Sequence, residues 1–191
     1  FDVRIESSSH LFIVQLSSIG GLPVLGIPMK EVSDLCEDVT HVVDESSSMT
    51  ELSDRLMGAP SEFECIKLLE SWVATRIASS STNKIMEQVI AEMNKTSGNC
   101  AVSSLAKQVD LSRRHLGRLV QQEVGLSPKQ LGRVIRFDRA VQLGRIRPGR
   151  SLSRIAFRSG YSDQAHMTRE FRQLGGITPS AIQRDSGALI W

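Results

Sequence analysis

The stretch IAFRSGYSDQAHMTREFRQLGGITPSAI, residues 155–182, carries side chains whose types suit hydrogen bonding to nucleic-acid bases. After a Gly-aromatic-Ser break, a helical pattern places Gln164, His166 and Arg169 away from its apolar face. That apolar face consists of Met167, Phe171 and Leu174. Arginine can donate two parallel hydrogen bonds to guanine, glutamine can pair with adenine, and histidine can bond either purine. The stretch therefore predicts a helix whose exposed face contacts base edges.

A weaker copy of the same pattern lies about fifty residues upstream. At an offset of fifty, Leu105, Ala106, Leu111 and Ser112 match Ile155, Ala156, Tyr161 and Ser162. After one inserted residue, Arg118, Val120, Gly125 and Pro128 match Arg169, Phe171, Gly176 and Pro179. Matching cap, turn and core positions indicate one supersecondary unit that is used twice. In the upstream copy, Arg114 and Arg118 are the outward side chains.

Each copy is predicted to be a helix-turn-helix unit. The small Ala106 and Ala156 allow the second helix to cross closely over the first. Asp110 and Gly160 occupy the turns, where a positive φ is free for glycine and tolerated by aspartate. Ser112 and Ser162 are expected to cap the second helices, whose first amides then point outward toward phosphate. The alternative, two hairpins with a solvated basic face, does not require this repeated frame.

The charge distribution supports a polyanionic partner for the second half only. Residues 1–82 hold 5 Lys or Arg against 13 Asp or Glu, a net charge of −8. The remaining 109 residues hold 18 basic and 8 acidic side chains, a net charge of +10. Such asymmetry between halves is typical of proteins whose basic part binds a polyanion such as nucleic acid.

The first half is predicted to be β-rich at its start and helical afterwards. FDVRIE alternates like a half-buried strand, LFIVQLS resembles a buried strand, and GGLPVLGIP interrupts regular structure. A helical pattern begins at Glu31, and two capping boxes, Ser48 with Glu51 and Ser61 with Glu64, each predict the start of a helix. Phe1 opens directly into an alternating pattern, so we expect the chain to be part of a longer protein.

We therefore predict an α+β fold with two domains that meet at the polar segment 79–83. Residues 1–82 would form a small β-rich remnant with helices, used for sensing or association. Residues 83–191 would form an all-α domain with helix-turn-helix units at about 101–124 and 151–175. A long helix from Pro128, capped by Ser127, to about Ile146 would join the two units.

Residues 84–184 resemble the DNA-binding domain of AraC/XylS-type transcriptional regulators. The resemblance rests on SLSRIAFRSGYSDQAHMTREFRQLGGITPSAI, residues 151–182, which is similar to the signature of that family through its whole length. It implies seven helices, with two helix-turn-helix units held by one long helix. It also implies that both recognition helices enter successive major grooves on one face of the duplex, about one helical turn apart.

The resemblance further implies which residues contact DNA. The family's base-contacting positions fall on Arg114, Gly117, Arg118, Gln164, Ala165, His166, Thr168 and Arg169, of which Gly117 and Ala165 are too short to donate a hydrogen bond. The predicted base-reading residues are therefore Arg114, Arg118, Gln164, His166, Thr168 and Arg169. The predicted phosphate contacts are Ser112, Arg113, Ser127, Arg133, Arg136, Arg158, Ser162 and Thr178; such contacts position a protein on DNA without specifying sequence.

Other classes of protein fit the sequence less well. A cupin-type metal oxygenase would need clustered histidine and carboxylate ligands, but His10 and His41 lie thirty-one residues apart. A non-enzymatic interaction module could use the basic half to bind an acidic protein, and base preference would distinguish it from a DNA-binding protein. Cys36, Cys65 and Cys100 are odd in number and far apart, as expected for reduced thiols.

The sequence thus predicts a cytoplasmic, non-enzymatic regulator that binds double-stranded DNA without a cofactor, a metal ion or a membrane. RNA polymerase and a small-molecule effector of the first half are further expected partners. Because two recognition helices lie in one chain, we expect that a monomer can occupy an asymmetric site, and a homodimer stays open as an alternative.

Overall fold

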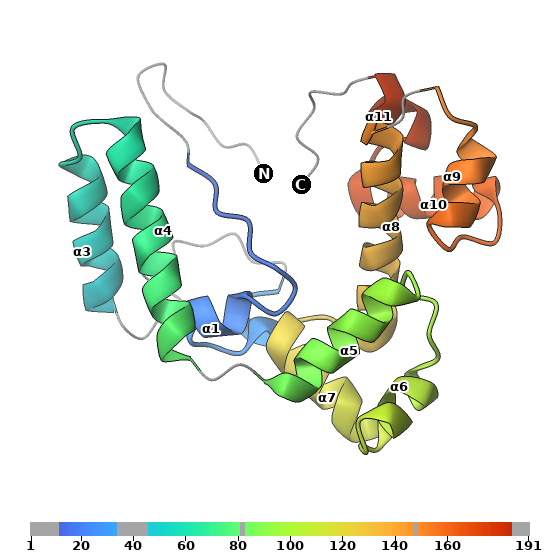
Figure 1. The fold of residues 1–191 in the computed structure, drawn as a ribbon, viewed down its shortest axis with the longest axis horizontal. Coiled ribbons are helices and arrows are strands. Elements are labelled where there is room, and N and C mark those ends of the chain that lie inside the picture. The colour runs from blue at the N-terminus through green and yellow to red at the C-terminus, as the bar shows by residue number, and fades with distance from the viewer. Residues whose placement is uncertain (1–11, 34–45, 81–82, 147–148, 185–191) are drawn as a thin grey trace. The chain divides into compact units, whose positions relative to one another are not determined.

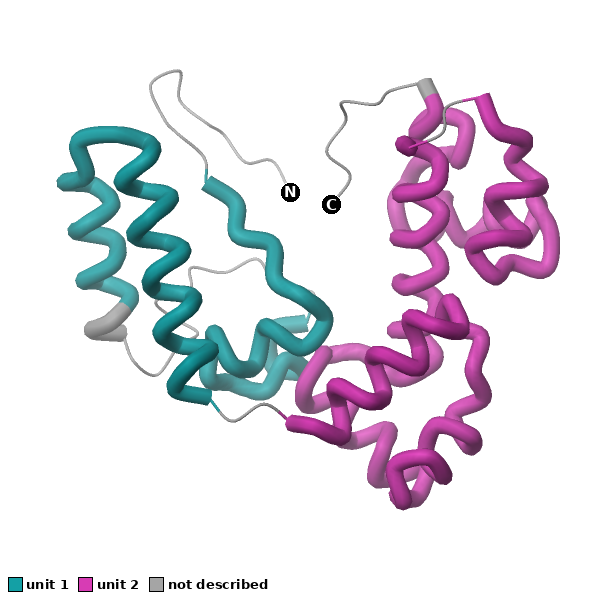
Figure 2. Tube along the Cα trace, viewed as in Figure 1, with its two compact units in different colours: residues 1–82 teal, residues 83–191 magenta. Residues whose placement is uncertain are grey.

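A computed structural model of the chain describes residues 12–33, 46–80, 83–146 and 149–184. The chain forms two compact units, Phe1–Thr82 and Asn83–Trp191 (Figure 2). Within the described ranges, no helix is both long enough and apolar enough to cross a membrane.

Helices are the only regular secondary structure among the described residues of the first unit. It contains α1 (Gly21–Leu25), the short 3-10 helix η1 (Met29–Glu31), α3 (Ser46–Met57) and α4 (Glu62–Ser79). The last two helices pack side by side (Figure 1). As predicted, Ser61 caps α4 by accepting a hydrogen bond from the Glu64 amide at 3.3 Å. The preceding helix begins at Ser46, two residues before the predicted cap at Ser48.

The predicted β-rich remnant, and with it the α+β fold class, is wrong. None of the described residues forms a strand, and residues 12–17 of the LFIVQLS segment have no regular structure. Ile13 and Val14 are 50% and 47% exposed. An apolar run becomes a strand only where a neighbouring strand satisfies its backbone groups, and no described residue supplies one. The FDVRIE pattern and most of the helix predicted from Glu31 lie outside the described residues.

As predicted, the secondary structure of the second unit is all-helical over residues 83–146 and 149–184. Its helices are α5 (Lys84–Lys95), α6 (Val102–Gln108), α7 (Arg113–Val124), α8 (Pro128–Ile146), α9 (Leu152–Arg158), α10 (Gln164–Gly175) and α11 (Pro179–Arg184). The long helix α8 contacts α5 and α7, which precede it in the chain, and α9, α10 and α11, which follow it (Figure 1). Ser127 caps it through the Gln130 amide, and its bounds agree with the predicted 128–146.

The second unit therefore consists of two helical modules, α5–α7 and α9–α11, that share α8. In the first module, Met86, Val89, Leu105, Leu116 and Val120 are almost completely buried. In the second module, Ile155, Ala156, Tyr161, Met167, Phe171 and Ile182 form one cluster with Ala140 and Val141 of α8. Each module therefore has its own core. Burying each large apolar side chain in it stabilises the fold by roughly 1.5–3 kcal/mol.

Two glycines allow α8 to lie against the loop that follows α5. Gly98 has a φ of +68°, and a Cβ atom added at Gly132 would lie 2.7 Å from the Gly98 carbonyl oxygen. Real side chains essentially never approach a backbone atom so closely. Glycine at both positions therefore permits direct backbone contact between the loop and α8.

Candidate nucleic-acid interface

The first helix-turn-helix unit consists of α6 and α7. Asp110 takes the predicted left-handed conformation in the turn, with a φ of +53°. The amide of Leu111 donates to the Ala106 carbonyl at 2.9 Å, which closes the turn over the buried alanine. Ser112 caps α7 by accepting from the His115 amide at 3.2 Å. Because Leu116 and Val120 face the core, the opposite side of α7 exposes Arg114 and Arg118.

The second unit, α9 and α10, repeats this geometry with a different cap. Gly160 provides the turn with a φ of +87°. The cap is Asp163, whose carboxylate accepts from the His166 amide at 2.7 Å, and the predicted cap at Ser162 is wrong. The residue inserted in this copy shifts the helix start by one position, so the Ser162 hydroxyl instead donates to the Asp163 carboxylate at 3.1 Å. The hydrogen bonds from His166 and then Ser162 lower the pKa of Asp163, which keeps its carboxylate ionised.

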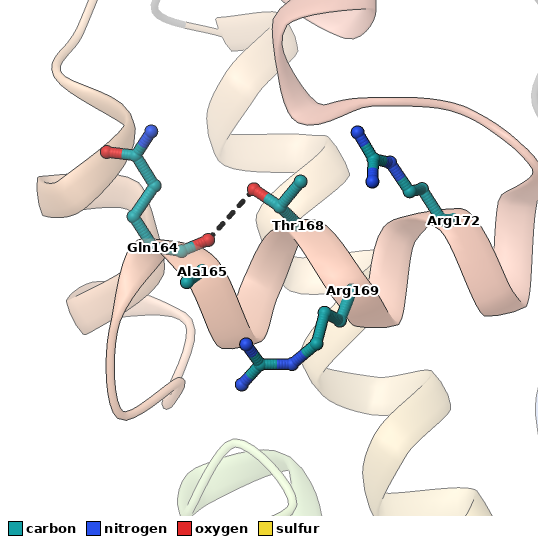
Figure 3. Close-up of a pocket in the computed structure, with 5 residues that line it drawn as sticks. All are labelled: Gln164, Ala165, Thr168, Arg169 and Arg172. Carbon is teal, nitrogen blue, oxygen red and sulfur yellow. Dashed lines mark hydrogen bonds between the residues drawn. The ribbon is translucent and has the colours of Figure 1, made fainter.

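The exposed face of α10 forms an open hollow. It is lined by Gln164, Ala165, Thr168, Arg169 and Arg172, and the guanidinium groups of the two arginines extend in different directions (Figure 3). The Thr168 hydroxyl donates to the Gln164 carbonyl at 2.9 Å, so its methyl group is the part that is free for a partner. The Gln164 side-chain oxygen accepts from Ser153 at 3.0 Å, which orients its amide group.

His166 is held against the turn and away from that hollow. Its ring lies edge-on to Tyr161, with the ring centroids 5.3 Å apart, and its Nδ1 lies 3.1 Å from the Ser162 hydroxyl. Tyr161 itself is 3% exposed, as expected for a core residue beside the turn. Burial, with a further contribution from the nearby Glu170, raises the pKa of its hydroxyl group well above the usual range.

Two arginines predicted to contact phosphate bind groups inside the domain. Arg133 donates to both carboxylate oxygens of Glu170, at 2.9 and 3.1 Å, and to Gln173 at 2.8 Å. Arg136 donates to the Gly98 carbonyl at 2.8 Å. These contacts join α8 to α10 and to the loop after α5, so both guanidinium groups stabilise the fold of the domain.

Comparison with known proteins identifies the domain. A family described as "Helix-turn-helix domain" matches residues 105–185. The chain is 27% identical over 157 residues to the HTH-type transcriptional activator RhaS of Klebsiella pneumoniae, an alignment that covers 81% of this chain and 56% of RhaS. Over 86 residues it is 33% identical to the HTH-type transcriptional regulator GlxA of Rhizobium meliloti, covering 45% of this chain and 26% of GlxA. The chain thus spans about half or less of the length of these relatives.

Solved structures agree with the sequence relatives. An AraC-type DNA-binding transcriptional regulator from Chromobacterium violaceum is similar with a TM-score of 0.50 and 25% identity, over 54% of this chain and 92% of that structure. The C-terminal domain of the response regulator AraT from Geobacillus stearothermophilus gives the same TM-score and identity, over 55% and 88%. The second half of the chain is an AraC/XylS-type DNA-binding domain.

The exposed face of this AraC/XylS-type domain includes one residue that sequence reasoning missed. Arg172 lines the hollow on α10 together with Arg169. The spacing alone predicts that Arg172 lies on this face, because Ala165, Arg169 and Arg172 follow one another at the four- and three-residue intervals of one helical face. The upstream copy has Gln121 at the matching position, so the alignment of the two copies did not draw attention to it.

The other predicted contact residues of the AraC/XylS-type domain lie near helix ends. Arg113 and Arg158 are exposed, at the start of α7 and the end of α9. The Ser127 hydroxyl donates to the Gln130 side chain at 2.6 Å within a reciprocal cap. Thr178 is half-buried immediately before α11, where its carbonyl accepts from the Ala181 amide. The two exposed arginines are therefore free to reach toward a partner, whereas Ser127 and Thr178 also serve the helix starts.

Proposed function

We propose that the protein is a sequence-specific transcription regulator that inserts α7 and α10 into two successive major grooves of double-stranded DNA. One observation carries the proposal: the same helix-turn-helix frame occurs twice in one compact unit, and each second helix exposes arginines. The net charge of +10 on this part of the chain supports binding to a polyanion. The relatives that share the domain are named transcriptional activators or regulators.

Affinity and specificity are assigned to different residues. Arg113, Arg158 and the first amides of α7 behind Ser112 contact phosphate and supply affinity. Arg114, Arg118, Gln164 and Arg169 bond base edges, and the Thr168 methyl group contacts thymine. His166 is held beside the turn by Ser162 and Tyr161, outside the hollow on α10, and we assign it a base contact at the start of that helix. Arg133 and Arg136 act inside the domain rather than on phosphate, on account of their partners there.

The remaining partners belong to the same proposal. A regulator of this kind acts in the cytoplasm without enzymatic activity of its own and communicates with RNA polymerase. The first unit, with its net charge of −8, is the part available for an effector or for association. Because both recognition helices lie in one unit, a monomer suffices to occupy an asymmetric site.

Selection of bound duplexes from a random pool, followed by footprinting, tests this function. We expect one asymmetric site with two short motifs about one helical turn apart, protected by a monomer. Enrichment of a single motif would show that only one helix reads bases. If no sequence is enriched and salt simply abolishes binding, the basic surface is unspecific and the proposed function is wrong.

A further inference from the structure

The two modules of the DNA-binding domain are connected by a direct contact in addition to α8. The side-chain amide of Asn99, in the loop between α5 and α6, donates to the carbonyl oxygen of Gly160 at 2.7 Å. Gly160 is the turn residue of the second helix-turn-helix unit, sixty-one residues further along the chain. This bond therefore joins the first module to the turn that precedes the second recognition helix.

Arg136 of α8 holds Asn99 in the orientation that this bond needs. One guanidinium nitrogen donates to the Gly98 carbonyl at 2.8 Å and to the Asn99 side-chain oxygen at 3.3 Å. With its oxygen bound there, the amide of Asn99 presents its nitrogen to Gly160. The guanidinium group also lies 5.9 Å from the centre of the Tyr161 ring, next to the same turn. We call Asn99, Arg136 and Gly160 the inter-module joint.

The repeat itself shows that this packing is particular to the second turn. The matching residue of the first unit, Asp110, is exposed. At Gly160, by contrast, an added Cβ atom would collide with the Asn99 amide nitrogen and lie 3.2 Å from the Cβ of Ser97. Positive φ alone would permit aspartate or asparagine at both turns. The absence of a side chain at Gly160 is thus needed for the contact with the first module.

We propose that Asn99 is a positioning residue that, through the inter-module joint, fixes the orientation of α10 relative to α7 and so the spacing of the two DNA motifs. The inference rests on the proposed function. Adding one base pair between two motifs moves one of them by about 3.4 Å and rotates it by about 35° around the duplex. Two modules joined only by α8 could adjust by bending that helix, whereas a second connection resists the adjustment.

Two variants open the joint by different routes. Asn99→Ala removes the amide that bonds Gly160. Gly160→Asn keeps a residue type that tolerates positive φ. Its Cβ atom displaces the end of the Asn99 side chain, and Ser97 needs to yield only slightly, so the turn itself should still form. Asn94→Ala is the matched control, because the Asn94 side chain is exposed on α5. Arg139 donates to the backbone carbonyl of Asn94, which the substitution keeps.

The first measurement compares the affinity of the full chain for duplexes whose motif spacing is changed by one base pair in either direction. We expect the native chain and Asn94→Ala to lose about tenfold or more at the wrong spacings, a difference of roughly 1.4 kcal/mol. Asn99→Ala and Gly160→Asn should bind all three spacings within about threefold of one another. Equal weakening at every spacing, with the native preference kept, would overturn the inference.

A second measurement needs no DNA. Residual dipolar couplings from the amides of the two modules should fit one common orientation in the native chain and in Asn94→Ala. In Asn99→Ala and Gly160→Asn they should require two different alignments, while the couplings of each module still fit the structure of that module. A single common orientation in both variants would overturn the inference.

The two measurements distinguish this inference from the proposed function. If the native chain selects no two-part site, the proposed function fails and takes the spacing role with it. If the native chain selects such a site and the variants keep its spacing preference, the function stands and only the role of Asn99 is wrong.

Discussion

Arginines that look alike along the sequence have different surroundings in the second unit. Arg169 extends from the exposed face of α10, one turn before Arg172, in a hollow that is open to a partner. Arg133 instead binds Glu170, which is 8% exposed. An arginine that is already engaged with a buried carboxylate has fewer N–H donors left and a guanidinium group held in place, so it is less available to phosphate. The function of each arginine therefore depends on its partner and not on the residue type.

Arg169→Ala should weaken binding to the selected DNA site by ~1–3 kcal/mol and relax specificity at one base position. The variant loses two hydrogen bonds to a guanine edge, and these bonds distinguish guanine from the other bases. Loss of a phosphate contact would weaken binding to every sequence equally and would leave specificity unchanged. Titration of the cognate and scrambled duplexes with both proteins measures the effect. An unchanged ratio between the two duplexes would show that α10 does not read bases through this side chain.

Arg133→Ala should lower the free energy of unfolding by roughly 1–3 kcal/mol, because Glu170 loses a charged hydrogen-bond donor. Denaturant unfolding measures this change. The companion variant Arg113→Ala should leave stability nearly unchanged and reduce the slope of log affinity against log salt by about one. If Arg133→Ala reduces the salt slope as much as Arg113→Ala does, Arg133 contacts phosphate despite its internal partner.

At the scale of helices, alanine substitutions at two glycines test how closely α8 and α7 are approached by their neighbours. Gly132→Ala in α8 should destabilise the domain, since the new Cβ atom meets the Gly98 carbonyl at 2.7 Å. Gly117→Ala in α7 has open space around it and should stabilise that helix by roughly 0.5–1 kcal/mol. Thermal unfolding of both variants beside the native chain gives the comparison. Stabilisation by Gly132→Ala would mean that the loop after α5 does not rest on α8.

Asp163 makes the start of α10 sensitive to acid. Its pKa is lowered from 3.8 in the folded chain, so the stability that it contributes is complete above 3.8 and is lost as the pH falls through the lower folded value. Asp163→Asn keeps a capping oxygen but cannot ionise. The native chain should therefore melt above the variant near neutral pH, and the difference should shrink below pH 3.8. A constant difference at every pH would argue against the cap.

The helices of the second unit were predictable from local signals, whereas the strands predicted for the first unit do not occur in its described residues. Ser127 with Pro128, the two turn residues and the repeated apolar spacing determine where its helices begin and end. The Asp163 cap was missed because one residue is inserted between the copies, and either Ser162 or Asp163 is a good capping type. The joint of Asn99 with Gly160 could not be predicted, since it depends on how two modules pack.

At the scale of the molecule, the charge is divided between the two compact units. Residues 83–191 carry a net charge of +10 and residues 1–82 a net charge of −8. Each module of the second unit has its own buried core around α8. Every helix of the proposed DNA interface belongs to this unit.

The fragment 83–191 should accordingly fold alone and protect the same DNA site as the full chain. Since it lacks the acidic half, its affinity for any duplex should be equal or higher at low salt, with the ratio of cognate to scrambled binding retained. Circular dichroism and footprinting of the fragment beside the full chain test this. A lost or shortened footprint would show that residues 1–82 take part in reading DNA.

The backbone contact between Gly98 and Gly132 has a consequence for protein engineering. If a chimaera takes its first module from this chain and α8 from a regulator without glycine at the position of Gly132, the new Cβ atom lies 2.7 Å from the Gly98 carbonyl oxygen. To exchange the specificity of the first module, the chain should therefore be cut after Gly132. The segment from α5 through Gly132 should be transferred as one piece. The second module can then be replaced if the donor also has a glycine at the position of Gly160.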